Sequence, residues 1–314
     1  MRSAAPRLFD DPIFRQRRRE QPKGVPVTVC IAARCGDFIV CASDRMLTND
    51  DVQFEPNRQK IYSLTPTIVV MTAGDTSFMT MVLANLIRLI QGFQDANGGA
   101  SPNVGDVVLS YVDCFSELRG QFAEDALLLP LGLTRQTFLE QQSTMNDEVV
   151  RKLTAGILDF YILPVEVIVA GRDPDGQTSI YTIKGINVQN LSTIGFAAVG
   201  IGARHAESQL MLSRYAWDSS LSDGLLHTYF AKKRAEIAPG VGTETDLVVI
   251  QPATAPSVMV ADSVKERLEA EYRKMVVAEG AAAQAAKAEI ASFIGSLLPG
   301  DPPPPPNMSD TIQS

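Results

Sequence analysis

The stretch VTVCIAARCGDFIVCAS, residues 27–43, constrains the fold of this chain more than any other. Two apolar runs rich in β-branched residues flank Cys35, Gly36 and Asp37, which supply the chemistry of a tight turn. The pattern predicts an antiparallel hairpin. Neither run alternates cleanly between apolar and polar residues, so both strands are expected to be buried on two faces. A sheet of this kind needs a covering layer on each side.

A second pair of strands and a long helix are expected directly after this hairpin. The runs QKIYSL (59–64) and TIVVMTAG (67–74) read as strands, and Asp75 and Thr76 can cap the helix that follows. That helix is apolar nearly all round. We therefore expect it to be covered on more than one side, by the rest of the chain or by a neighbouring subunit.

Like elements then continue in blocks. Residues 104–160 read as helical, with a break at Pro130 and Gly132. Residues 165–183 read as a second hairpin. The remaining segments read as a strand leading through glycines into a helix (196–212), a further helix (222–238) and a final strand (243–251). Blocks of strands and helices, without strict alternation, predict an α+β fold with two sheets between helical layers.

The expected domain organisation has one globular domain with appendages. Residues 1–27 read as an extended N-terminal arm or propeptide, because prolines recur there without periodicity. The domain spans 28–255 and contains the helical insertion of about 104–160. A charged, then alanine-rich helical extension covers 256–298, and the proline run in 299–314 predicts a disordered tail.

Composition excludes several classes of function. A net charge of −8 argues against nucleic acid as a partner, since phosphate binding depends on clustered Lys and Arg. No unbroken apolar run approaches the roughly 18 residues of a membrane span, and the N-terminus lacks the apolar core of a secretory signal, so we expect a cytoplasmic protein. The four cysteines lack CxxC spacing and only two histidines accompany them, so neither a metal nor another cofactor is expected and the thiols are expected to be free and buried.

The candidate chemistry centres on Thr28. Asp44 follows it by 16 residues, Lys60 by 32, and Gly74 lies at the turn into the predicted helix. A threonine hydroxyl is a weak nucleophile that needs an adjacent base, which a free N-terminal amine can provide. A nearby lysine favours the alkoxide, and an aspartate keeps that lysine charged. A backbone N–H at the mouth of a helix can receive the oxyanion.

These residues resemble a known family. The segments TVCIAARCGDFIVCASDRMLT, QKIYSL and MTAGD are similar to the N-terminal half of proteasome β-type subunits, including the bacterial relatives HslV and Anbu. The resemblance extends more loosely to about residue 251. The resemblance implies that Thr28 is the nucleophile and that Asp44 and Lys60 are its charged partners. It also implies that the backbone at Thr48 aligns the substrate and that the Gly74 N–H binds the oxyanion.

The resemblance implies the four-layer αββα sandwich of the Ntn hydrolases and threonine-dependent hydrolysis of peptides or unfolded proteins. It also implies a homo-oligomeric ring or helical stack that encloses the active sites. An ATPase unfoldase is a possible partner of such an assembly. A catalytically inactive structural subunit of such an assembly is the alternative, and a small-molecule amidase on the same fold is a third reading.

Several features of the sequence depart from the family. The glycine turn after the strand at 196–199 reads Gly200-Ile201-Gly202, where the family often has a serine. Near the last core helix, Glu236, Thr243 and Asp246 give no clean match to the expected acid and serine. These departures favour the inactive alternative, and the long segment 104–160 indicates an extra helical insertion at the rim of a particle.

The residues before Thr28 decide between these readings. Thr28 acts as its own base only if its amine is free, and Val27 is not the glycine usual at self-processing sites. Translation from the Val27 codon, followed by removal of the initiator methionine, is a second route to the same N-terminus. Cys30 is expected to fill core space, and Arg45 to pair with Asp50 or Asp51.

Overall fold

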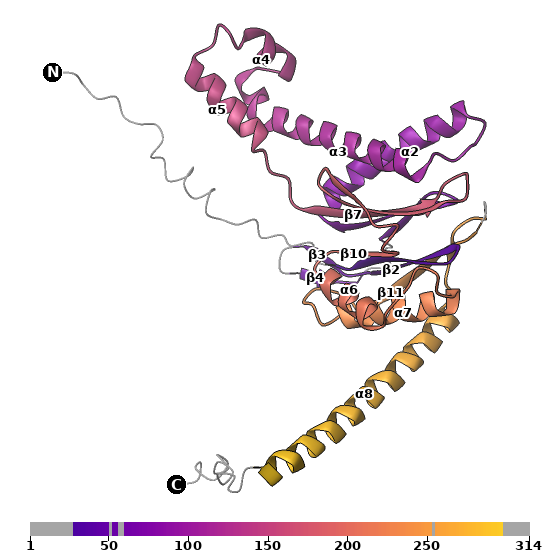
Figure 1. Cartoon of the computed structure of the whole chain (residues 1–314). Coiled ribbons are helices and arrows are strands. Elements are labelled where there is room, and N and C mark those ends of the chain that lie inside the picture. Colours follow the sequence, from indigo (N-terminus) through magenta and orange to yellow (C-terminus); the bar gives the residue numbers. More distant parts are fainter. Residues whose placement is uncertain (1–27, 50–51, 56–59, 253–254, 298–314) are drawn as a thin grey trace, which may run out of the picture. The chain divides into compact units, whose positions relative to one another are not determined.

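The structure is a computed structural model that describes residues 28–49, 52–55, 60–252 and 255–297 (Figure 1). The chain divides into two compact units, Met1–Val260 and Ala261–Ser314. The predicted arm at 1–27 and the predicted tail at 299–314 lie outside the described residues.

Two five-stranded antiparallel sheets form the centre of the first unit, which confirms the predicted α+β class. The first sheet has the order β10-β1-β2-β11-β12, with strands Phe196–Val199, Cys30–Cys35, Phe38–Asp44, Thr245–Ile250 and Val258–Met259. The second has the order β5-β6-β7-β8-β9, with strands Ile61–Thr65, Ile68–Gly74, Val165–Arg172, Thr178–Lys184 and Asn187–Asn190. A two-stranded ribbon pairs β3 and β4, Leu47–Asn49 and Val52–Phe54.

The predicted hairpins are confirmed. Strands β1 and β2 pair from Cys30↔Ser43 to Cys35↔Phe38, and Gly36 makes the turn with a φ of 58°. Such a positive φ costs glycine little because it has no Cβ. The pairs β5–β6 and β7–β8 also occur where the sequence predicts them.

The two sheets pack face to face over a shared apolar core. Alternate residues of β1 and β2, such as Ala32, Ile39 and Cys41, lie in one cluster with Met71 of β6 and Ile168 of β7, and all five are fully buried. Because successive strand residues point to opposite faces, the other residues of β1 and β2 face outward, and all of them except the half-buried Phe38 are buried as well. The first sheet is therefore covered on both faces, as its sequence requires.

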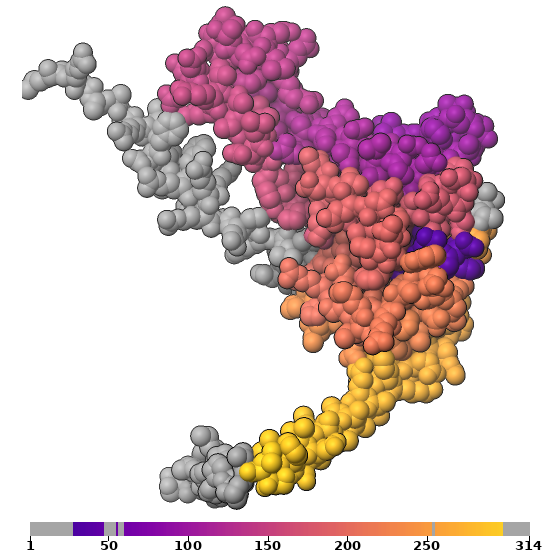
Figure 2. Space-filling view, in the orientation of Figure 1, coloured from indigo at the N-terminus to yellow at the C-terminus, as the bar shows by residue number. Residues whose placement is uncertain are grey.

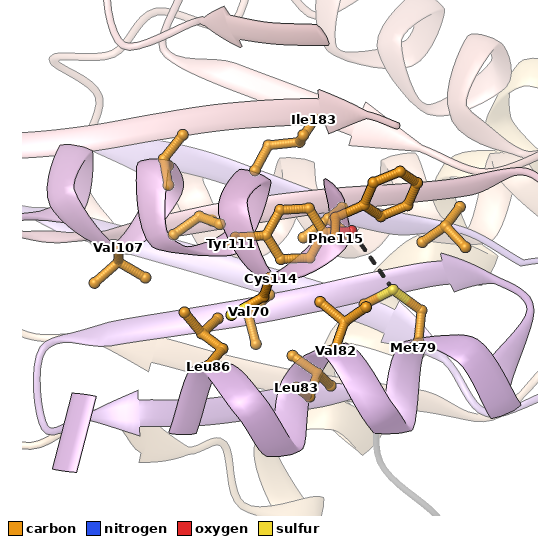
Figure 3. Packing of buried hydrophobic residues seen from close by; sticks show 14 of the residues in the cluster. Val70, Met79, Val82, Leu83, Leu86, Val107, Tyr111, Cys114, Phe115 and Ile183 are labelled. Carbon is orange, nitrogen blue, oxygen red and sulfur yellow. Dashed lines mark hydrogen bonds between the residues drawn. The ribbon is translucent and has the colours of Figure 1, made fainter. Parts of the chain in front are cut away.

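Helices α2 (Thr76–Ala96) and α3 (Val104–Leu127) pack on the outer face of the second sheet. Asp75 caps α2 by accepting a hydrogen bond from the Phe78 N–H at 2.8 Å, as predicted. Figure 3 shows the interface, in which the Tyr111 hydroxyl donates to the Met79 sulfur at 3.6 Å. Residues of both helices and of the sheet line it, namely Val70, Val82, Leu83, Leu86, Val107, Cys114, Phe115 and Ile183.

Within the part of the chain that the structure describes, only one face of α2 is covered. Its buried residues lie toward the sheet and α3, whereas Met81, Leu89 and Phe93 are exposed. Among the described helices, α2 alone is long and apolar enough to cross a membrane by length and composition, and its packing in the core accounts for much of that apolar character.

The outer face of the first sheet carries α6 (Ala203–Leu212) and α7 (Leu221–Ala235), which pack on each other and on β1, β2 and β10. The order of layers is thus helices, sheet, sheet, helices (Figure 1).

The predicted helical segment between β6 and β7 extends beyond α3. It continues through the 3-10 turn Leu129–Leu131 into α4 (Arg135–Gln141) and α5 (Asp147–Leu158). This lobe, pink in Figure 2, has a small core of its own around Leu128, Leu133 and Phe138.

The second unit contains α8, which spans Asp262–Leu297. The helical extension is expected from the sequence to begin at 256, but strand β12 (Val258–Met259) precedes the helix. Exposed ion pairs such as Glu269–Arg273 run along its first half. Its second half is rich in alanine.

Candidate functional site

Four of the predicted site residues, Thr28, Asp44, Lys60 and Gly74, lie at one end of the two sheets, where several strands begin or end. In the first sheet β1 and β11 begin where β2 and β10 end. In the second sheet β5 and β7 begin where β6 ends. The segments that enter and leave these strands therefore converge at this end, although they come from distant parts of the sequence.

Thr28, Asp44 and Lys60 form one hydrogen-bonded group. The Thr28 hydroxyl donates to Asp44 Oδ1, and the Lys60 ammonium donates to the Thr28 Oγ1. Lys60 Nζ also lies 2.9 Å from Asp44 Oδ1. All three residues are buried, with Asp44 fully so. The ammonium favours the alkoxide form of this hydroxyl, whereas the carboxylate accepts its proton in a hydrogen bond and orients it.

The Asp44 carboxylate is held by backbone amides in addition to Lys60. Its Oδ1 accepts a hydrogen bond from the Val29 N–H at 3.0 Å. Its Oδ2 accepts from the N–H groups of Met46 at 3.1 Å and Gly242 at 3.0 Å. Three amides and one ammonium compensate the cost of burying the charge and fix the rotation of the carboxylate.

The Gly200-Ile201-Gly202 turn lies against the Thr28 main chain. The Gly202 N–H donates to the Thr28 carbonyl at 3.2 Å, and a Cβ on Gly200 would strike that same carbonyl. The Gly200 N–H donates at 2.9 Å to Glu166, which comes from β7 of the opposite sheet. A carboxylate thus anchors this turn, and it ties the two sheets together at the site.

A buried lysine, Lys232, binds the loop whose Gly242 N–H donates to Asp44. Lys232 of α7 is fully buried, and its ammonium donates to the carbonyls of Gly242 and Thr243, both at 2.9 Å, and to Glu236 at 2.7 Å. Burial lowers the pKa of Lys232, while Glu236 acts in the opposite direction.

Arg45 has a partner that the sequence analysis did not consider, and its expected pairing with Asp50 or Asp51 stays a prediction. Its guanidinium Nε and Nη2 bind Asp246 Oδ1 at 2.9 and 2.6 Å, across the β2–β11 pair. Asp50 and Asp51 lie outside the described residues. Asp246 is fully buried, so this pair serves to position β11 beside β2 rather than to face solvent.

Gly74 ends β6 with a φ of 120°, and a Cβ there would strike the Pro164 carbonyl. It pairs with Val165, the neighbour of Glu166, which places it at the same end of the sheets as Thr28. The hydrogen-bonded group around Thr28 does not include Gly74. Thr48 lies in β3, paired with Gln53, and its side chain is outside the described part of the structure.

Cys30 packs two residues from Thr28 as a core residue, as predicted, and its thiol donates to the Thr72 carbonyl at 3.5 Å. Burial raises the pKa of this thiol to about 12, so it stays protonated at neutral pH and is a poor nucleophile. All four cysteines are free and buried. Among the described residues no cluster of three or more His, Cys, Asp or Glu is arranged to hold a metal ion.

No protein-family model matches the sequence, and no curated protein shows significant similarity to it. The case for chemistry at this site therefore depends on its geometry. Sequence reasoning missed Glu166, Lys232 and Gly242. A usable signal existed only for Lys232, which stands among Thr228, Ala231 and Ala235 on the buried face of its helix.

Proposed function

We propose that this chain is a threonine-type peptide hydrolase of the proteasome-like Ntn class, with Thr28 as nucleophile once its amine is free. The observation that carries the proposal is the Thr28 hydroxyl held between the Asp44 carboxylate and the Lys60 ammonium. An isolated Asp–Lys pair on a surface is commonplace and contributes little. This pair is buried and contacts a hydroxyl at the start of a strand, which supports a chemical role.

In the proposed mechanism the free amine of Thr28 takes the hydroxyl proton as the Oγ1 attacks a peptide carbonyl. Lys60 stabilises the developing alkoxide, and Asp44 keeps Lys60 charged and oriented. The Gly74 N–H is proposed to receive the oxyanion. Collapse of the tetrahedral intermediate breaks the C–N bond, and the Thr28 ammonium returns its proton to the leaving amine. Water, activated by the same amine, then hydrolyses the Thr28 ester.

The order of layers supports the same proposal, since helices, sheet, sheet and helices are the order expected of the αββα sandwich. We extend the proposal to a cytoplasmic homo-oligomer that encloses the site and takes peptides or unfolded chains as substrates. The exposed apolar residues of α2 are consistent with a subunit contact.

The structural subunit is the second candidate, and one observation favours it. In the full sequence the Thr28 nitrogen forms a peptide bond with Val27, and Thr28 is only 2% exposed. Without a free amine the proposed base is missing. The two candidates therefore differ in whether residue 28 becomes an N-terminus.

The test is a chain made to begin at Thr28 by removal of a preceding fusion, assayed on peptide substrates and with a threonine-directed β-lactone. We expect turnover and one lactone adduct on Thr28. Thr28→Val should abolish both, and Thr28→Ser should keep part of the activity. Thr67→Val, at a buried threonine whose hydroxyl donates to the Arg172 carbonyl, is the matched control and should leave turnover intact.

A folded chain that begins at Thr28, yet cleaves no peptide and takes up no lactone, would overturn the hydrolase proposal and leave the structural subunit. Intact mass of the protein from its native host is the complementary measurement. A mass that begins at Thr28 supports the hydrolase, whereas retained residues 1–27 in an assembled particle support the subunit.

A further inference from the structure

Lys232 is an unusual residue to find fully buried in the middle of a helix. Lysines are almost never buried in full unless they are paired, because removing the ammonium from water is costly. Glu236, one turn later at the C-cap of α7, supplies the paired charge at 2.7 Å. The other two partners are main-chain carbonyls of Gly242 and Thr243, which belong to the loop before β11. An ion pair that served α7 alone would not need those carbonyls.

That loop reaches the centre of the candidate site. The Gly242 N–H donates to Asp44 Oδ2 at 3.0 Å, so the same residue accepts from Lys232 and donates to Asp44. A Cβ on Gly242 would meet the Glu55 carboxylate and lie 2.9 Å from the Met46 Cβ, which shows how tightly the loop is packed. Glu55 also accepts from the Glu244 N–H at 3.3 Å.

We propose that Lys232 is a positioning residue whose ammonium acts as a built-in cation: it binds the carbonyls of Gly242 and Thr243 and thereby aims the Gly242 N–H at Asp44. Asp44 in turn orients the Thr28 hydroxyl through its other oxygen. The effect on catalysis rests on the proposed function, whereas the effect on the loop does not.

The main test removes the ammonium and leaves an unbranched apolar side chain that is only one atom shorter. Lys232→Met keeps the packing of the buried stem but removes the donor to both carbonyls. In a chain that begins at Thr28 we expect kcat to fall roughly 10–100-fold with KM nearly unchanged, as for a small misplacement of a catalytic group. Hydrogen exchange of peptides that cover residues 240–244 should become at least about tenfold faster.

Lys233→Met is the matched control. Lys233 is the next residue, and its ammonium pairs with the same Glu236 at 2.8 Å. If Lys232 merely stabilised α7 through Glu236, the two variants would have similar effects. We expect Lys233→Met to leave both kcat and exchange of the loop within about twofold of the parent.

Chemical rescue covers the case in which Lys232→Met does not fold. Lys232→Ala removes the equivalent of a propylammonium ion, so the variant is refolded with and without propylammonium, with the neutral propanol as control. Recovery of slow loop exchange with the ammonium alone supports the proposal. Equal recovery with propanol, or none with either, would overturn it by showing that the cavity and not the cation matters.

The outcomes separate this inference from the proposed function. Faster loop exchange in Lys232→Met, in a protein that hydrolyses nothing, would retain the built-in cation and reject only the hydrolase. Parental kcat and parental loop exchange in a folded Lys232→Met would reject the positioning role while the hydrolase stands.

Discussion

At the scale of single residues, Asp44 is the site residue whose substitution we expect to lower the free energy of unfolding most. Asp44→Asn removes the charge that compensates Lys60 and places amide hydrogens among groups that already donate. Breaking a buried pair in this way costs about 3–5 kcal/mol. We expect a loss of that size in the free energy of unfolding measured by urea denaturation.

Asp37→Asn is the control for the same chemical change at an exposed position. Its carboxylate is 76% exposed and lies 3.6 Å from Arg172. An exposed pair of this kind contributes about 0–1 kcal/mol. If both variants lost a similar amount of unfolding free energy, the burial and pairing of Asp44 would not be what makes it important for stability.

The buried thiols give a prediction about reactivity. Burial raises the pKa of Cys30 to about 12 and that of Cys35 to about 11, from 9.0. At pH 8 almost no thiolate is present on either residue, so iodoacetamide should label them far more slowly in the native protein than in urea. Peptide mass spectrometry at timed intervals measures this, and equal rates in the two states would contradict it.

The same shifts predict a dependence of stability on pH. Because the folded thiols hold their protons more tightly than the unfolded ones, they stabilise the protein fully below pH 9. That contribution is lost as pH rises from about 9 toward 11 and 12. The urea midpoint of the parent protein should therefore fall as the pH is raised from 7 through this range. Cys30→Ala should show a smaller fall from its own midpoint at pH 7, because it lacks one of the two thiols.

Part of the site could be predicted from the sequence and part could not. The spacing of Thr28, Asp44 and Lys60 marks the ends of strands that local patterns already reveal. The pairing of Arg45 with Asp246 could not be predicted from local sequence, because the register of β2 with β11 brings these two distant residues together. Glu166 is likewise recruited across the two sheets, and no local pattern encodes that contact.

At the scale of elements, the junction between β6 and α2 depends on Gly74. Its φ of 120° is rarely adopted by residues with a side chain, and a Cβ would strike the Pro164 carbonyl. We expect Gly74→Ala to lower the free energy of unfolding by about 1–3 kcal/mol. The measurement is chemical denaturation followed by circular dichroism.

Gly92 in α2 provides the opposite case. A Cβ there meets no atom within 4 Å, and its position is helical. Gly92→Ala should therefore raise stability by about 0.5–1 kcal/mol through helix propensity alone. Destabilisation by both substitutions would contradict the view that backbone geometry at Gly74, and not glycine in general, is what matters.

One physical reason explains why the sequence did not predict two of the strands, β9 and β12. Strands β9 and β12 lie at the edges of their sheets, and all of their residues are exposed. An edge strand with no buried face has no alternation to detect. The buried hairpins, by contrast, were evident from composition and turn residues alone.

At the scale of the whole molecule, stability is expected to be uneven. Strands β1, β2, β6 and β7 are almost entirely buried, and their amides form continuous ladders. In α8 only Leu268 is buried, and every residue from 280 to 297 is exposed. Such a helix can open locally at little cost, because its helicity depends mostly on the propensity of its alanines.

Hydrogen exchange followed by mass spectrometry should reveal this difference. We expect peptides from residues 280–297 to exchange within seconds to minutes at neutral pH, while peptides from β1 and β2 exchange only on the timescale of global unfolding. Protection of 280–297 equal to that of β2 would contradict this expectation. If that protection vanished on dilution, a second copy of the chain would be covering Ile290, Ile294 and Leu297, whose side chains are 41–60% exposed in the single chain. If it persisted on dilution, a contact within one chain would be responsible.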